Sequence, residues 1–382
     1  MRPGVFGEVF SWSWLFSEKG RTFLCAQTYS RISTVFDQTR FVVEAPAVYT
    51  AGMTPLLLHA HHASQNASFC QLGGREAVEA FTSLQEEYEA MTRGRGLLDF
   101  SFRECLAVTG PDRQTFLQGM CSQNLSSLQE GESTYATFLT SKGAMVSDAR
   151  ILVGPDVLWL DVEPGTSSTL WGHLSKFLVS EDAEVADVSS DWALVSLLGP
   201  DCTGVAVPSG TWALPHLLPD VAGVDFLVPR ARLPEVYEAL RATPGTQPVG
   251  HAAWNSLRVE QGIPRFGEDM GPTTLPLEAR LERALHYNKG CYLGQEVVAR
   301  ATFRGHMNRL LAGFLLGQSP LPVGTEFLQN DKKVAWLTSV AFSPRRKQWV
   351  ALGYAHRDFL SPGTRLSAPN LPDEAIVSAL PF

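Results

Sequence analysis

The residues with the clearest capacity for chemistry lie in the segment KGCYLGQEVVAR, residues 289–300. Cys291 stands between Gly290 and Gly294, so the backbone there can turn tightly and approach a ligand closely. Lys289 and the positive end of a helix expected over QEVVAR would both favour the thiolate, the nucleophilic and metal-binding form of cysteine. These residues predict a functional thiol on a loop. The alternative is a small buried cysteine in a simple turn.

The other cysteines give this thiol no partner by their spacing. The chain has six cysteines and no CxxC pair, which argues against a zinc site or a disulfide framework and favours a reducing cytoplasm. We therefore expect no metal site within the chain, and a cluster at Cys291 would need ligands from elsewhere. A net charge of −8 argues against general binding to nucleic acids, and we find no apolar run of the ~20 residues that a membrane span needs.

The elements that must position the thiol form an α+β fold of two or three domains, because 382 residues exceed one ordinary core. Residues 1–52 are predicted to be an extension without function, the alternative being an ordered N-terminal arm. Residues 53–300 form an α+β region, in which near-helical apolar spacing predicts a helix over residues 74–94 that ends at Gly94. Short strands and regular turns over residues 301–382 are typical of a small β-barrel or sandwich.

Two segments of the α+β region share one pattern. RECLAVTGPDRQTFLQGM (residues 103–120) and WALVSLLGPDCTGVAV (residues 192–207) each end an apolar strand with Gly-Pro-Asp, which in the first segment opens a predicted helix. The repeat predicts two related α+β halves, although glycine-proline after a strand is also common punctuation. Between them, residues 135–153 and 157–163 are predicted to be antiparallel hairpin strands.

The motif KGCYLGQE resembles the K-G-C-Y-x-G-Q-E signature of the YgfZ family of folate-binding proteins, whose eukaryotic members act in mitochondrial iron–sulfur assembly. The resemblance starts near residue 93 and continues through GLLDFS, LAVTGPDRQTFLQGMCSQNLSSL, SLRVEQGIPRFGED and the terminal β domain. The wider superfamily includes the glycine-cleavage aminomethyltransferases, which bind tetrahydrofolate in a central opening. The resemblance therefore implies a three-domain, aminomethyltransferase-like folate-binding fold with duplicated α+β halves and a C-terminal β-barrel.

The same resemblance implies site residues, with two departures from an active aminomethyltransferase. Those enzymes carry paired aspartates after a glycine turn, and GAMVSDAR keeps only the second position, as Asp148. Their folate-holding glutamate and arginine match Asp225 and Trp254, so the arginine is missing and Trp254 would instead stack on a flat ring. Arg258 nearby would bind the glutamate tail. The structural alternatives are a strand-end aspartate, a core tryptophan and a helix-surface pair of Arg258 with Glu260.

From these features we expect a tetrahydrofolate-binding accessory protein that supports the assembly or repair of iron–sulfur enzymes, with turnover left open. Its partners would be folate and iron–sulfur enzymes or assembly proteins, in the cytoplasm or, in a eukaryote, the mitochondrial matrix. The alternative is a folate-dependent aminomethyl or methyl transferase, and a thiol-redox role lacks a resolving cysteine. The working groups would be Cys291, Lys289 and Asp148. The folate would be bound by Asp148, Asp225, Trp254, Arg258, Tyr292, Gln295 and Glu296.

Overall fold

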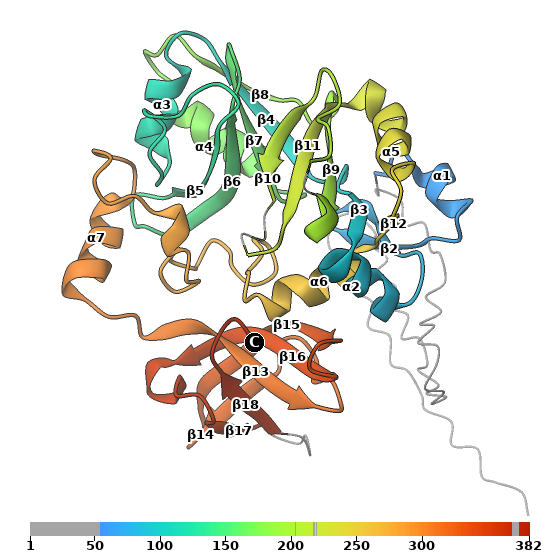
Figure 1. The fold of residues 1–382 in the computed structure, drawn as a ribbon. Helices are drawn as coiled ribbons and strands as arrows, with labels where there is room; N and C mark the ends of the chain where they lie inside the picture. The colour runs from blue at the N-terminus through green and yellow to red at the C-terminus, as the bar shows by residue number, and fades with distance from the viewer. Residues whose placement is uncertain (1–53, 203, 217, 219, 369–373) are drawn as a thin grey trace, which may run out of the picture. The chain divides into compact units, whose positions relative to one another are not determined.

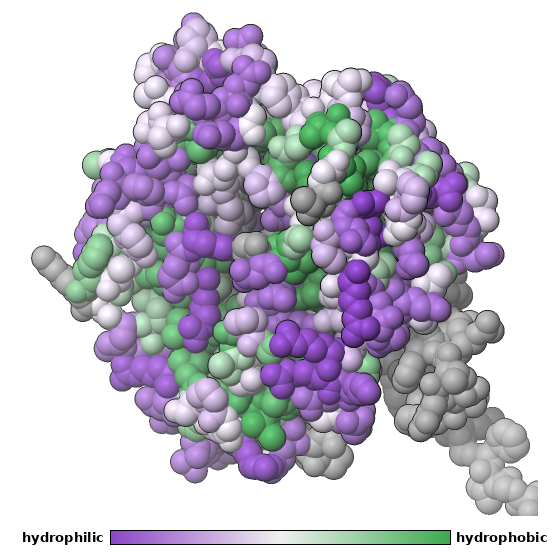
Figure 2. Space-filling view, in the orientation of Figure 1, coloured by the Kyte–Doolittle hydropathy of each residue, from purple (hydrophilic) through white to green (hydrophobic). Residues whose placement is uncertain are grey.

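The computed structural model describes residues 54–382, apart from residues 203, 217, 219 and 369–373. The extension predicted for residues 1–52 lies outside the described residues. Figure 1 shows an α+β region, coloured from blue to yellow, followed by a β domain in orange and red. Within the described residues, we find no helix with the length and apolar character of a membrane span. On the face seen in Figure 2, hydrophobic residues form separate groups among hydrophilic ones.

One five-stranded antiparallel sheet, in the order β5-β6-β7-β4-β8, contains the first repeated segment. Its strands are β4 (Glu104–Thr109), β5 (Ser133–Leu139), β6 (Met145–Val153), β7 (Val157–Val162) and β8 (Glu184–Asp187). The helices α3 (Arg113–Met120) and α4 (Ser167–Phe177) share one buried core with the sheet, to which they contribute Leu117 and Leu170. The predicted hairpin strands and the helix after Gly-Pro-Asp are confirmed.

A second five-stranded sheet, in the order β10-β11-β9-β3-β12, contains the second repeated segment. Its strands are β3 (Arg95–Asp99), β9 (Trp192–Leu198), β10 (Trp212–Pro215), β11 (Gly223–Pro229) and β12 (Thr246–Pro248). Only β12 pairs in parallel, with β3. The second Gly-Pro-Asp forms a short 3-10 turn, η1 (Pro200–Cys202), and the long helix of this half, α5 (Leu233–Arg241), comes later. Each sheet contains one of the two repeated segments, but only the first Gly-Pro-Asp opens a helix, so the duplication of the two halves remains a prediction.

The helix expected over residues 74–94 is wrong in its first half. Strand β2 (Arg75–Ala80) pairs with β1 (Ser68–Leu72), and the helix α2 (Leu84–Arg93) begins only afterwards; the short α1 (His59–Ala63) precedes both. The hairpin follows from Gly73 and Gly74, which take the positive φ angles of 54° and 82° that a tight two-residue turn needs. A capping box between Ser83 and Glu86 then fixes the start of α2.

The helix α6 (His251–Glu260) joins the two parts of the fold. It packs on α2 and β2 of the α+β region and on β15 and β16 of the β domain. After α6 the chain runs through a long loop and the 3-10 turn η3 (Glu282–Ala284) to the Cys291 loop and the helix α7 (Gln295–Arg304).

The β domain is a six-stranded antiparallel sheet in the order β14-β15-β16-β13-β18-β17, which curls into a barrel in Figure 1. Its strands are β13 (Arg309–Gly317), β14 (Glu326–Gln329), β15 (Lys332–Ser343), β16 (Gln348–His356), β17 (Arg365–Ser367) and β18 (Glu374–Ser378). The fully buried rings of Phe314 and Phe327 stack at 6.1 Å between centroids in its core. The barrel expected after residue 300 is therefore present.

Candidate functional site

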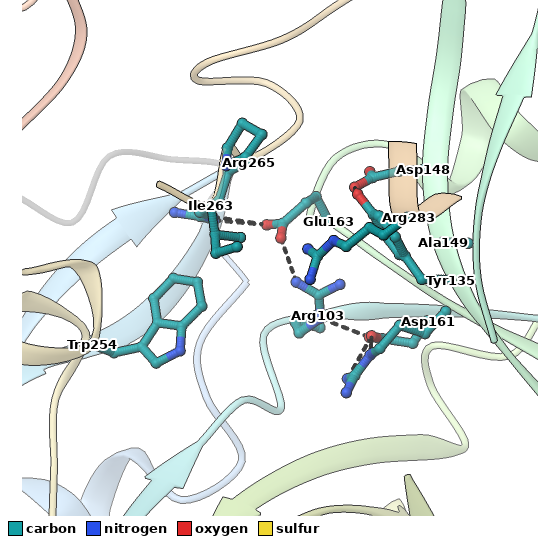
Figure 3. A pocket seen from close by; sticks show the side chains of 12 residues that line it. Arg103, Tyr135, Asp148, Ala149, Asp161, Glu163, Trp254, Ile263, Arg265 and Arg283 are labelled. Carbon is teal, nitrogen blue, oxygen red and sulfur yellow. Dashed lines mark hydrogen bonds and ion pairs between the residues drawn. The ribbon is translucent and has the colours of Figure 1, made fainter. Parts of the chain in front are cut away.

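A small cavity between the first sheet and α6 is lined by a group of buried ionisable side chains (Figure 3). Its volume is ≈ 20 Å³, enough for about one water molecule. Strand register explains its composition, because Tyr135, Arg150 and Asp161 are cross-strand neighbours, and Asp148, two residues before Arg150, lies on the same face. The cavity is lined by Arg103, Tyr135, Asp148, Ala149, Arg150, Asp161, Glu163, Trp254, Ile263, Pro264, Arg265 and Arg283.

A continuous chain of buried ion pairs runs along the wall of this cavity. Arg265 pairs with Glu163 at 2.7 Å. Arg103 connects Glu163 to Asp161, and Arg150 donates to the other oxygen of Asp161 at 2.8 Å. Burial opposes the ionisation of Glu163, but Arg103 and Arg265 outweigh it and hold the pKa of that carboxyl well below its usual range. Each charged side chain in this series is stabilised by the oppositely charged groups next to it, because the loss of one partner would leave an uncompensated buried charge.

Asp148 also lines the cavity, but its carboxylate takes no part in this series of ion pairs. Within the described residues it forms no ion pair, and its one side-chain hydrogen bond comes from the Tyr135 hydroxyl at 2.5 Å. Burial raises the pKa of Asp148 to about 6, because the bond from Tyr135 and the charge of Arg103 only partly offset the lost hydration. Asp148 can therefore change its protonation near neutral pH and accept further hydrogen bonds from a ligand.

Trp254 and Asp225, which the resemblance implied as folate residues, lie in different surroundings. Trp254 lines the cavity with 3% of its surface exposed, and the guanidinium carbon of Arg265 lies 5.6 Å from its ring centroid. Asp225 is fully buried outside the lining, where it pairs with Arg150 and His216. The carboxylate of Asp225 therefore does not face the cavity, and the lining residue that it pairs with is Arg150.

Arg258 does not line the cavity, contrary to expectation. Its side chain is fully buried, pairs with Asp269 at 2.5 Å, and donates at 2.7 Å to Ser339 of the barrel. The face of α6 that carries Arg258 is turned toward the barrel, so this arginine fastens the helix to the β domain. Arg265 of the long loop and Arg283 of η3 line the cavity instead.

Cys291 is exposed on the loop between η3 and α7, where its flanking glycines predicted it. Gly290 and Gly294 both adopt left-handed backbone angles, with φ of +94° and +86°. Gly294 is also the N-cap of α7, so the start of that helix follows the cysteine as expected. The part of the motif that holds the thiol is thus a solvent-facing turn.

Lys289, expected to favour the Cys291 thiolate, is engaged elsewhere. Its ammonium donates at 2.6–2.7 Å to the backbone carbonyls of Gln118, Cys121 and Gln123, at the end of α3. The thiol bonded to it is that of Cys121, at 3.8 Å. Lys289 therefore anchors the base of the Cys291 loop to α3, which is a structural role.

Three further residues predicted to bind folate gather at a second hollow. Tyr292, Gln295 and Glu296 line a more open depression of ≈ 570 Å³ beside α7. The Gln295 side chain accepts from the Tyr292 backbone at 3.1 Å, and Glu296 pairs with Arg300 at 2.6 Å. None of the three lines the central cavity. Asp148 and Trp254 thus line the central cavity, three predicted residues lie near Cys291, and Asp225 and Arg258 line neither hollow.

Sequence reasoning misses most of the ion-pair chain. Arg103 lies in the first repeated segment, Tyr135 in a predicted hairpin and Arg265 in a segment that carries the family resemblance, but none stands out by its own pattern. Asp161 and Glu163 offered a signal: two carboxylates two residues apart, at the end of the otherwise apolar strand VLWLDVE. Such a pair lies on one face of a strand and needs cations when that face is buried.

Comparison with known proteins assigns this geometry to a family. Residues 58–207 match the family model of the GCVT N-terminal domain, and residues 309–382 match that of the glycine cleavage T-protein C-terminal barrel domain. The chain belongs to the glycine cleavage T-protein superfamily.

Relatives within the T-protein superfamily resemble nearly the whole described chain. The aminomethyltransferase of Thermosynechococcus vestitus is 27% identical over 324 residues, which cover 79% of this chain and 88% of that protein. The aminomethyltransferase of Corynebacterium aurimucosum is 27% identical over 360 residues, or 85% and 96% of the two chains. The structure of glycine cleavage system aminomethyltransferase T from Bartonella henselae matches with a TM-score of 0.78 at 21% identity, over 86% and 98% of the chains. The aminomethyltransferase-like fold is confirmed, and these matches do not single out the YgfZ family.

Proposed function

We propose that the protein binds a reduced folate at the central cavity and uses it in one-carbon transfer of the T-protein type. The observation that carries the proposal is Asp148, a cavity carboxylate without an ion pair among the described residues and with a pKa of about 6. Such a group accepts N–H donors and exchanges a proton near neutral pH. Relatives named aminomethyltransferase support the transfer reaction.

The lining residues fit a folate in kind. Tyr135 and Trp254 offer aromatic surface for a flat ring, and the guanidinium groups of Arg265 and Arg283 suit the carboxylates of a glutamate tail. A volume of ≈ 20 Å³ is far smaller than such a ligand. Binding therefore requires side chains of the cavity to move outward, and the long arginines after α6 are the ones with the reach to do so.

Tyr135 and the folate would each contact a different oxygen of Asp148. The Tyr135 hydroxyl donates its hydrogen bond to Oδ2 of Asp148. Oδ1 is therefore the oxygen that would accept a hydrogen bond from the ligand. Burial excludes water from that contact, which strengthens it. A carboxylate that is partly protonated near neutral pH can also take up the proton that a folate nitrogen releases when it gains a carbon substituent.

Calorimetric titration with tetrahydrofolate under reducing conditions tests the proposal. The wild-type protein should bind, and Asp148→Asn should bind at least roughly tenfold more weakly, because the amide keeps the shape and loses the charge. Asp156→Asn, at an exposed position on the turn before β7, is the matched control and should bind like the wild type. If the wild-type protein shows no binding, the folate assignment fails.

A second candidate function is the accessory role in iron–sulfur enzyme assembly or repair. It is carried by Cys291, which is exposed, whereas Cys105, Cys121 and Cys202 are buried and Cys70 is partly buried. The relatives named above give this role no support. The exposed thiol must first be reactive: in the native protein, a maleimide reagent should modify Cys291 before the other described cysteines, as peptide mass spectrometry would detect.

Complementation then separates the two functions. In cells that lack the protein, the accessory role predicts that Cys291→Ser, at equal abundance, fails to restore iron–sulfur enzyme activity. Full restoration would remove this candidate. A defect confined to one-carbon metabolism, repaired by Cys291→Ser but not by Asp148→Asn, is the outcome expected for the transferase.

A further inference from the structure

His216 is a buried residue, absent from the predicted site, that connects the cavity to the ion pairs behind it. It lies directly after β10, and its side chain is 1% exposed. Its ring nitrogens have different partners: Nε2 lies 3.3 Å from Nε1 of Trp254, and Nδ1 lies 2.6 Å from Oδ1 of Asp225. His216 therefore stands between an aromatic residue of the cavity and a buried carboxylate.

These partners fix the protonation of the ring. The indole N–H of Trp254 is a donor only, so Nε2 of His216 must accept. Nδ1 faces a carboxylate oxygen and must carry the proton. Asp225 also pairs with Arg150 and accepts from the hydroxyl of Ser196, which keeps it ionised. The hydrogen bonds on the two sides of the ring therefore assign Nε2 as the acceptor and Nδ1 as the donor.

Among the residues that the structure describes, the bond from Trp254 to His216 is the only hydrogen bond of the indole. The other aromatic and cationic neighbours are Phe100, at 5.4 Å between centroids, His251, at 5.5 Å, and Arg265, at 5.6 Å. Such ring contacts restrain the indole by packing and tolerate some rotation. Nε1 is the only polar atom of the side chain, so its acceptor decides which way the ring is turned.

We propose that His216 is a positioning residue that sets the orientation of Trp254 for ring stacking with the folate. The proposal rests on the proposed function, since it concerns the same cavity. A tryptophan cannot bind a carboxylate as an arginine would, but a fixed indole face suits a flat pterin or benzoyl ring. Arg150 and Asp225 act behind it, because the ion pair holds the carboxylate that orients His216.

Two substitutions separate the two hydrogen bonds of His216. The amide nitrogen of His216→Asn takes the place of Nδ1 and can still donate to Asp225, but nothing then accepts from Trp254. The longer side chain of His216→Gln places its amide oxygen near Nε2, where it can accept from Trp254, and it leaves Asp225 with one donor fewer. Each variant therefore keeps the contact that the other loses.

We expect the two variants to differ in affinity. His216→Asn should bind tetrahydrofolate roughly five- to tenfold more weakly, as the loss of one orienting hydrogen bond implies, and it should unfold at lower urea concentration than the wild type, because the buried indole N–H of Trp254 loses its acceptor. His216→Gln should unfold at lower urea concentration and bind with near wild-type affinity below its transition. If affinity follows stability in both variants, or if neither variant changes affinity, His216 has only a structural role and the proposal fails.

The ring nitrogens give a readout that needs no ligand. In ¹⁵N-labelled protein, Nε2 of His216 should show the chemical shift of an unprotonated nitrogen that accepts a hydrogen bond, and Trp254→Phe should shift it further toward a free nitrogen. A proton on Nε2 would overturn the proposal whether or not folate binds. Absence of tetrahydrofolate binding by the wild type, together with the expected Nε2 signal, would instead refute the proposed function and leave the orientation of Trp254 by His216 established.

Discussion

Asp148 shows how burial, assisted by the nearby charge of Glu163, turns an ordinary carboxylate into a group that titrates near neutral pH. Its pKa is raised to about 6 by burial, from the 3.8 of a solvated aspartate. The folded protein therefore binds this proton more tightly than the unfolded chain does. The destabilising effect is absent below the unfolded pKa, grows as the pH rises between the two values, and is complete above pH 6. At about 1.4 kcal/mol per pKa unit, it amounts to about 3 kcal/mol.

Asp148→Asn should therefore increase the free energy of unfolding while it weakens folate binding. We expect a gain of about 3 kcal/mol at pH 7.5 and about half of that at pH 5, where much of the wild-type carboxyl is already protonated. Urea unfolding at the two pH values measures the difference, with the exposed Asp156→Asn as the control. A loss of stability at pH 7.5 would show that the ionised carboxylate is favoured in the folded protein, and would contradict this account of the site.

Single residues were predictable where the backbone decides their surroundings. The two glycines around Cys291 place it on an exposed turn, and the motif places Asp148 beside a strand face that the sheet buries. Lys289 and Arg258 were misjudged for one physical reason. Both side chains are long, and their partners are far away in sequence: the carbonyls around Cys121 for the lysine, and Ser339 for the arginine.

At the scale of elements, the Cys291 loop is shaped by two glycines under different constraints. Both have left-handed φ angles, which cost a residue with a Cβ about 1–2 kcal/mol. A Cβ at Gly294 would also lie 2.6 Å from the backbone oxygen of Thr140, in the hairpin between β5 and β6. A Cβ at Gly290 would meet nothing within 4 Å. The second glycine thus sets how closely α7 approaches the first sheet.

The pair of substitutions Gly294→Ala and Gly290→Ala measures that approach. Both variants should lose unfolding free energy because alanine is strained at a left-handed φ. Gly294→Ala should lose a further ~1–3 kcal/mol, because its new Cβ would clash with a backbone carbonyl, which cannot move aside as a side chain can. Chemical denaturation of the two variants gives the difference directly, with Gly290→Ala as the matched control. Equal losses would mean that the start of α7 can move away from the hairpin at little cost.

Elements were predictable from the sequence where local signals agree. The strand, Gly-Pro-Asp and helix of the first repeat agree, so the order of β4 and α3 was foreseen. Around Gly73 and Gly74 the signals conflict: the apolar spacing that extends α2 backward also fits the inner face of a hairpin strand. The turn glycines and the capping box at Ser83 decide the outcome, and periodicity alone gives them too little weight.

At the scale of the whole described chain, α6 holds the α+β region and the barrel together through buried polar groups. Glu260, which the structural alternative placed on the helix surface, is 2% exposed and accepts hydrogen bonds from Tyr88 of α2, at 2.5 Å, and from Ser343 of the barrel. Arg258, two residues earlier, binds Asp269 and Ser339. Buried polar contacts of this kind are satisfied in only one arrangement, so they hold α6 in a fixed position beside the cavity. The predicted domain boundaries at residues 52 and 300 remain a prediction.

Arg258→Met tests this joint and separates it from ligand binding. Removal of the guanidinium leaves Asp269 buried without its cation, which should cost about 3–5 kcal/mol of unfolding free energy. Arg300→Met, at an exposed pair on α7, is the matched control and should change stability by less than about 1 kcal/mol. Addition of Asp269→Asn to Arg258→Met should recover part of the loss, because the uncompensated charge is then gone. Folate affinity measured well below the unfolding transition should stay near that of the wild type. A large fall in affinity at unchanged stability would instead return Arg258 to the binding site.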